Sequence, residues 1–314
     1  MSTLKIYLFR RFLIKKSGQS IEGLDSQKVK ELLCYLLLNQ QRPHTREKLS
    51  SLLWPSSNES QAKQYLRQTL WQLQSTLESE LDDDVPLLLV ETNWIQVNQT
   101  ADYWVDVAEF EHLYNYVRGK EGSSLNGVEV EKIKLGITLY RGDFLENWYQ
   151  DWCVFERERL QNIYLAMLDK LLGRCEALRT YEQGLMYAMQ ILQFDRAHER
   201  TYRRLMRLYY YAGDRTNALR QFVRCTTILL DELGVEPSRR TVTLYEQIKA
   251  DRLSLKEELL EKNTSANLPN KTSGSSQADI LIRLRRLKET LLHAQRQVEQ
   301  EIDAVTRIPN NFDI

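Results

Sequence analysis

Apolar residues occur with two different spacings in the first hundred positions of the chain. Four short apolar runs predict β-strands, bounded by turn-forming residues. These runs are residues 4–9, 12–15, 87–91 and 94–98. Three longer stretches repeat apolar residues every three or four positions and predict amphipathic helices. These stretches are residues 25–39, 45–54 and 58–79. A turn at Thr92 and Asn93 joins the last two strands into a hairpin, so the pattern predicts a winged-helix domain over residues 1–100.

The third predicted helix, residues 58–79, has two faces of different character. Its buried stripe follows from the spacing of five apolar residues, Ala62, Leu66, Leu70, Leu73 and Leu77. The opposite face presents polar and aromatic side chains, Gln64, Arg67, Gln68, Trp71 and Ser75. Arginine and glutamine can each form two hydrogen bonds to a base edge, and Lys63 on the flank suits a phosphate. We therefore expect this helix to enter the major groove of DNA.

From residue 103 the pattern changes to long amphipathic helices, the first of which we expect Asp106 to cap. Shifting this part of the chain by 34 residues superposes similar positions, such as Leu171 on Leu205 and Gly184 on Ala218. A helix–turn–helix unit of this length is the period of tetratricopeptide (TPR) repeats. The sequence therefore predicts a mainly α chain with a TPR-like helical domain over residues 101–253.

The remaining residues resemble neither domain. Residues 254–278 predict a helix extension and then a flexible linker, because Pro269, Gly274 and several serines lie there. Residues 279–314 carry apolar positions at nearly heptad spacing. These positions are Ile280, Leu284, Leu287, Leu291, Ala294, Val298 and Ile302. Two interpretations stay open, a short dimerising coiled coil and an amphipathic helix that docks on the protein's own body.

Charge is unevenly distributed, although 43 Lys and Arg balance 43 Asp and Glu. Residues 1–77 contain 12 basic and 5 acidic side chains, a net charge of +7. Residues 78–91 contain six acids and no base. The positive excess therefore lies in the predicted winged helix, where we expect a nucleic-acid contact. Such a charge is also ordinary for the surface of a small domain.

A row of arginines marks the predicted helical domain. Its members are Arg196, Arg200, Arg203, Arg204 and Arg207. Spacings of three and four residues place most of them on one side of a helix. The row fits a solvent-exposed helix face, and it also fits a surface for an acidic partner.

Motifs of enzymes and metal sites are missing from the sequence. No G-x-x-x-x-G-K-[ST] phosphate loop, G-x-S-x-G or H-E-x-x-H occurs, and the four histidines lie far apart. The four cysteines are isolated, which indicates reduced, buried thiols. We therefore predict no enzymatic activity, no cofactor and no metal. No apolar run is long enough for a membrane span or a signal core, which predicts a cytoplasmic protein without membrane contact.

Two sets of segments carry a family resemblance. The first set is residues 27–38, 45–54 and 62–70. The second set is residues 139–145, 152–160, 229–238 and 243–247, which include the run Leu233-Gly-Val-Glu-Pro-Ser238. The first set resembles the OmpR-type winged helix at the front of SARP-type bacterial transcriptional regulators. The second resembles the bacterial transcriptional activator domain that follows it in that family.

The resemblance covers residues 4–253 and has implications for function. It implies that the third helix reads the major groove and that the hairpin touches the adjacent minor groove. It also implies that the helical domain serves dimerisation, contact with RNA polymerase or reception of a signal. One segment departs from the family, since Trp71-Gln-Leu-Gln-Ser75 stands where the family has a serine and an Arg-Leu-Arg cluster. With fewer phosphates neutralised, we expect weaker and less salt-dependent DNA binding than in the family.

These features together predict a sequence-specific transcriptional activator that binds double-stranded DNA as a homodimer. The expected contacts to bases are Gln64, Arg67, Gln68 and Trp71. The expected contacts to phosphates and at the wing tip are Thr45, Arg46, Lys63 and Asn93. RNA polymerase is a further expected partner, and the dimerisation residues expected in the tail are Ile280, Leu284, Leu287, Leu291 and Val298. The alternative is a scaffold or signalling adaptor that binds proteins through both domains.

Overall fold

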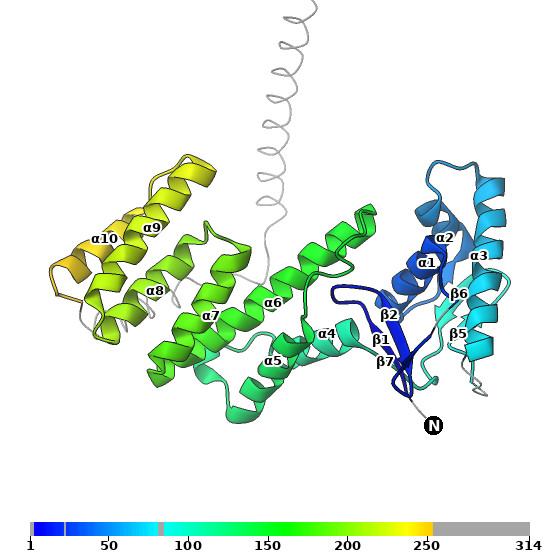
Figure 1. The fold of residues 1–314 in the computed structure, drawn as a ribbon, viewed down its shortest axis with the longest axis horizontal. Helices are drawn as coiled ribbons and strands as arrows, with labels where there is room; N and C mark the ends of the chain where they lie inside the picture. Colours follow the sequence, from blue (N-terminus) through cyan, green and yellow to red (C-terminus); the bar gives the residue numbers. More distant parts are fainter. Residues whose placement is uncertain (1–2, 22, 81–84, 254–314) are drawn as a thin grey trace, which may run out of the picture. The chain divides into compact units, whose positions relative to one another are not determined.

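The fold is known from a computed structural model, which describes residues 3–21, 23–80 and 85–253 (Figure 1). The chain divides into two compact units, residues 1–251 and residues 252–314. The first unit contains the predicted winged helix and the predicted helical domain up to residue 251. The acidic run at residues 82–84 and the predicted linker and C-terminal helix at residues 254–314 lie outside the described residues.

A four-stranded sheet opens the first unit. It has the order β3-β2-β1-β7, with β1 (Leu4–Tyr7), β2 (Leu13–Lys16), β3 (Gln19–Ser20) and β7 (Tyr103–Val105). Strand β1 runs antiparallel to β2 and parallel to β7. Ile6 faces both Ile14 and Val105 across these ladders, and all three side chains are buried. Strand β7 follows the hairpin in the sequence and pairs with β1, so the N-terminal sheet extends past the predicted domain boundary at residue 100.

The three predicted helices and the predicted hairpin are present. The helices are α1 (Gln27–Leu38), α2 (Arg46–Leu53) and α3 (Glu59–Glu80). The second sheet has the order β4-β6-β5, with β4 (His44–Thr45), β5 (Leu88–Val90) and β6 (Trp94–Val97). Strands β5 and β6 form the antiparallel wing, with Leu88 opposite Val97. Pairing of Thr45 with Trp94 holds the wing beside the start of α2.

Asp106 joins the first sheet to the helices that follow. It is the first residue of α4 (Asp106–Val117) and not its N-cap, which is Val105. Its buried carboxylate accepts hydrogen bonds from the backbone amides of Leu8, Phe9 and Val107 at 2.8–3.1 Å. The expected capping role is therefore replaced by a link between α4 and the end of β1.

The rest of the described chain is helical and stacks in pairs (Figure 1). After the short 3₁₀ turn η1 (Gly122–Ser124), the helices are α5 (Gly127–Leu139), α6 (Asp151–Leu178), α7 (Tyr181–Phe194), α8 (Glu199–Tyr211), α9 (Arg215–Leu233) and α10 (Arg239–Lys249). The pairs α6/α7 and α8/α9 are the two units of the 34-residue repeat. Gly184 and Ala218, at equivalent positions, are both buried. A Cβ on Gly184 would lie 3.2–3.3 Å from side-chain atoms of Leu208 and Cys175, so a small residue is needed for α7 to pack.

Candidate nucleic-acid interface

Helix α3 buries one side and exposes the other, as the apolar spacing predicts. Ala62, Leu66, Leu70, Leu73 and Leu77 are each at most 5% exposed. The opposite stripe, Gln64, Arg67, Gln68, Trp71 and Ser75, is exposed to solvent. Trp71 is 71% exposed, although indole side chains usually bury most of their surface. The stripe offers hydrogen-bonding groups and one large aromatic surface to a ligand.

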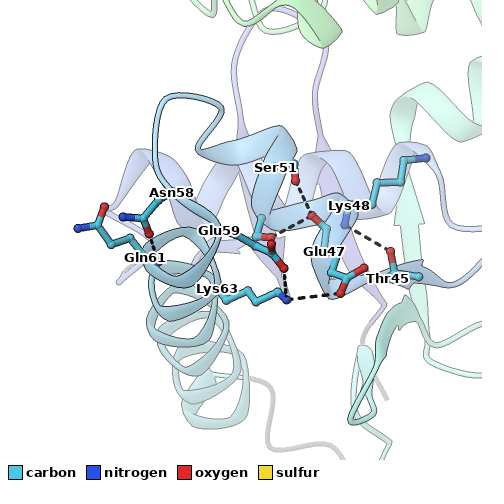
Figure 2. A network of polar contacts seen from close by, with 9 residues as sticks. Thr45, Glu47, Lys48, Ser51, Asn58, Glu59, Gln61 and Lys63 are labelled. Atoms are coloured by element: carbon cyan, nitrogen blue, oxygen red, sulfur yellow. Dashed lines mark hydrogen bonds and ion pairs between the residues drawn. The ribbon is translucent and has the colours of Figure 1, made fainter.

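Asn58 and Thr45 fix where the two helices of this surface begin. The Asn58 side chain accepts a hydrogen bond from the backbone amide of Gln61 at 2.9 Å, which caps α3. The Thr45 hydroxyl accepts one from the backbone amide of Lys48 at 3.3 Å, which caps α2 (Figure 2). Lys48 itself is exposed in the first turn of α2. The Thr45 hydroxyl therefore already has a partner within the protein. Lys48 is a further exposed cation at this helix start, which the sequence pattern does not single out as a phosphate contact.

Lys63 is held by two carboxylates at the junction of α2 and α3. Its Nζ lies 2.5 Å from Glu59 Oε1, one turn earlier on α3, and 3.4 Å from Glu47 Oε1 on α2 (Figure 2). The hydrogen bond that Lys63 donates to the Glu59 carboxylate raises the pKa of Lys63, so the ammonium stays charged. A phosphate would have to compete with both carboxylates for this group.

Arg46 connects α2 to the wing. Its guanidinium donates two hydrogen bonds, at 3.1 and 3.2 Å, to the backbone carbonyl of Glu91. Its backbone amide donates to the carbonyl of Asn93 at 3.1 Å, and Asn93 is exposed at the wing turn. The structure therefore brings Thr45, Arg46 and Asn93 together at one edge. Arg46 stabilises the wing there in addition to any role toward a ligand.

This surface carries little net positive charge. Arg67 is the one cation of the exposed α3 stripe. Exposed Glu78 follows it on the same side of the helix, and Glu59 and Glu47 neutralise Lys63. The net charge of +7 that the sequence shows for residues 1–77 is therefore not concentrated on α3.

Within residues 3–21, 23–80 and 85–253, no cluster of His, Cys, Asp and Glu has the arrangement of a metal site. The four cysteines are buried and unpaired with one another, and burial raises the pKa of Cys153 to about 11 and of Cys225 to about 12. Thiols with such pKa values are poor nucleophiles at neutral pH. Among the same residues, no helix combines the length and apolar character that crossing a membrane requires.

A comparison with protein families identifies the second half of the fold. Residues 105–249 match the family model described as the bacterial transcriptional activator domain. Because of this similarity, residues 105–249 are called the activator domain below. The activator domain begins at the end of β7 and runs from α4 to the last residue of α10.

One solved structure extends the likeness to most of the chain. It is EmbR from Mycobacterium tuberculosis in complex with a low-affinity phosphopeptide, and the superposition has a TM-score of 0.62 at 16% identity. The match covers 85% of this chain and 70% of EmbR. No curated protein sequence matches the chain. The activator domain and the shared fold agree with the resemblance to SARP-type transcriptional regulators, and they confirm the mainly α fold.

The arginine row lies inside the activator domain, and most of its members form ion pairs with carboxylates of the same domain. Arg204 on α8 is buried and pairs with Glu176 at 2.7 Å and with Asp169 at 2.5 Å, both on α6. Arg200 reaches the same Asp169 at 3.6 Å, and Arg203 reaches Glu199 at 3.4 Å. Arg196 lies 3.5 Å from Glu232 on α9. Four of the five arginines therefore connect helices or turns of the activator domain.

Proposed function

We propose that this protein is a sequence-specific, DNA-binding transcriptional regulator of the SARP type, acting as an activator, with α3 in the major groove. The activator domain at residues 105–249 supports a role in transcription. The observation that carries the DNA contact is the exposed stripe of α3, which follows a short helix and precedes a β-hairpin wing. A helix in this position is a recognition helix when its exposed side chains can bond base edges.

Four residues of the stripe are assigned to bases. The Arg67 guanidinium suits O6 and N7 of guanine, and the amides of Gln64 and Gln68 suit N6 and N7 of adenine. The exposed Trp71 ring provides apolar contact, for which the methyl group of thymine is the matching surface in the major groove. Each bidentate contact contributes about 1–3 kcal/mol of discrimination against the wrong base.

The start of α2, the first turns of α3 and the wing are assigned to the DNA backbone. Thr45, Arg46, Lys63 and Asn93 remain the proposed contacts, and Lys48 joins them because it is exposed beside the Thr45 cap. Cations and amides at a helix N-terminus favour a phosphate. Arg46 and Lys63 already have protein partners, so Lys48 and Arg67 contribute most of the electrostatic attraction.

The activator domain is assigned to protein contacts. We propose that it serves a homodimer and contact with RNA polymerase, in the cytoplasm where bacterial promoters lie, without cofactor or catalysis. Dimerisation through residues 279–314 concerns residues that are not described. Light scattering of the chain lacking residues 279–314 tests it, since a lower mass than that of the full chain supports a coiled coil and an unchanged mass rejects it.

A second candidate function has its own supporting observation. An exposed tryptophan among neutral side chains is typical of protein-binding surfaces, where aromatic residues are enriched and charge is depleted. Trp71 and its neighbours Gln68 and Ser75 fit that description. In this case the winged helix of a scaffold or signalling adaptor binds a protein and not DNA.

Duplex DNA binding at low salt separates the two functions. The full chain is mixed with a labelled duplex of random sequence at about 50 mM salt, where phosphate contacts are strong. The proposed function predicts a complex that weakens at higher salt and is weaker for Arg67→Ala. Arg240→Ala, which removes an exposed arginine from the start of α10, serves as the matched control and keeps the wild-type affinity. Absence of any complex supports the adaptor.

A further inference from the structure

We propose that the exposed face of α9 is the surface through which two copies of this chain pair, antiparallel and about a two-fold axis. The inference rests on the homodimer of the proposed function and adds the surface that forms it. Three observations carry it, namely an apolar stripe that the described residues leave exposed, charges that complement themselves, and the spacing between them.

The apolar stripe lies opposite the buried side of α9. The buried side consists of Ala218, Gln221, Cys225 and Leu229, which face α8 and α10. The opposite side exposes Val223, Thr227 and Leu230, spaced four and three residues apart. Val223 is 60% exposed and Leu230 is 59% exposed, as is Leu233 at the end of the helix. Contiguous apolar side chains at such exposure mark an interaction surface more often than single ones do.

Charges beside the stripe change sign along the helix. Arg220 and Arg224 flank it in the N-terminal half, and Asp231 flanks it in the C-terminal half on the same side. All three are exposed. Neither Arg224 nor Asp231 forms an ion pair with another residue in the part of the chain that the structure describes. A helix with this pattern attracts a second copy of itself when the two run in opposite directions.

The spacing fits a two-fold axis between Thr226 and Thr227. Such an axis sets Val223 level with Leu230 of the second copy, because both lie three and a half residues from the centre. On the flank, Asp231 of the second copy then falls between Arg220 and Arg224, within one helical turn of each. An isologous contact needs this kind of self-complementarity. A parallel pair would set this charged flank against the opposite flank of the second copy, so that Asp231 would not meet Arg220 and Arg224.

Sedimentation velocity of the full chain over a range of concentrations tests the surface. A single helix pair is small for an interface, so the dimer is expected to dissociate at concentrations on the order of micromolar. Leu230→Glu should weaken the dimer at least tenfold, while Met186→Glu, an equally exposed site on α7, should leave it unchanged. Because both positions are exposed, the variants keep the fold, which circular dichroism verifies.

Charge reversal tests the antiparallel pairing most directly. Arg224→Glu and Asp231→Arg should each weaken the dimer, and the two together should restore it, because the pair is re-formed with opposite signs. A monomeric wild-type chain at all concentrations, a dimer unaffected by Leu230→Glu, or a double variant no better than the singles overturns the inference. The DNA contact is tested separately, since Arg67→Ala is expected to weaken DNA binding and to keep the dimer.

Discussion

Lys63 and Glu59 form an ion pair of 2.5 Å within the first turns of the proposed recognition helix, and Glu47 of the preceding helix joins it at 3.4 Å. The surface that should face DNA therefore neutralises one of its own cations. Together with the neutral Trp71-Gln72-Leu73-Gln74 segment, this arrangement limits the electrostatic part of DNA binding. In the proposed complex, recognition then depends more on Arg67 and the glutamines than on phosphate attraction.

Glu59→Gln should strengthen DNA binding and make it more sensitive to salt. The substitution removes the closest carboxylate from Lys63, which can then reach a phosphate. One more neutralised phosphate steepens the slope of log affinity against log salt by about 0.9. Fluorescence anisotropy with a labelled duplex at several salt concentrations measures this slope. In a Lys63→Ala background the same substitution should change the slope little, and an equal change in both backgrounds contradicts the role given to Lys63.

Trp71→Ala should weaken DNA binding without weakening the fold. The ring is 71% exposed, so its removal leaves no cavity, and the free energy of unfolding should change by less than about 0.5 kcal/mol. Loss of its apolar contact should lower the affinity for a selected duplex by roughly tenfold, about 1.4 kcal/mol. Leu70→Ala, one residue earlier but buried, should instead destabilise the protein by about 2–5 kcal/mol. Urea unfolding measures the change in stability, and anisotropy measures the change in DNA affinity. A large loss of stability in Trp71→Ala would contradict the exposed position of the ring.

Arg204→Ala should destabilise the activator domain far more than Arg200→Ala. Arg204 is buried between Asp169 and Glu176, and removing one partner from a buried ionic cluster costs about 3–5 kcal/mol. Arg200 is 64% exposed and reaches Asp169 at 3.6 Å, so its loss should cost less than about 1 kcal/mol. Thermal or urea unfolding of the two variants gives the comparison. Equal stabilities would show that the arginine row is a surface feature.

Asp106 should make stability depend on pH between about 4 and 6. Burial raises its pKa from 3.8 to about 6, against the three backbone amides and the charge of Arg141, which lower it. The folded state then binds the proton more tightly than the unfolded state, so this contribution is complete below about pH 4 and is lost as the pH rises through 6. Urea unfolding at pH 4–7 should show wild type losing stability relative to Asp106→Asn. If the wild type instead gains stability relative to Asp106→Asn over that range, the hydrogen bonds from the amides lower the pKa of Asp106 by more than burial raises it.

Much of the fold follows from local patterns in the sequence. The period of Leu66, Leu70 and Leu73 predicts both the buried side of α3 and the exposure of Trp71, because side chains three to four residues apart share a face. The 34-residue shift predicts the pairs α6/α7 and α8/α9 for the same reason. Strand β7 is missed because three residues are too few to show a period, and its partner β1 lies about a hundred positions away in the chain.

The partners of charged side chains are harder to predict. Lys63 and Glu59 are four residues apart on one helix, so that pair is visible in the sequence. By contrast, Lys63 meets Glu47, and Arg46 meets the carbonyl of Glu91, only because α2, α3 and the wing pack together. Likewise, nothing in the spacing of the arginine row distinguishes buried Arg204 from exposed Arg200.

The most direct test of the central claim is selection of duplex DNA from a random pool by the purified full-length chain and by Arg67→Ala. The account predicts that the wild type enriches a defined sequence containing guanine. It also predicts that Arg67→Ala loses the preference for that guanine and keeps the remaining positions, since one bidentate contact supplies about 1–3 kcal/mol of discrimination. If the wild type enriches no sequence, or if Arg67→Ala enriches the same sequence with the same guanine preference, α3 does not read DNA in the way proposed.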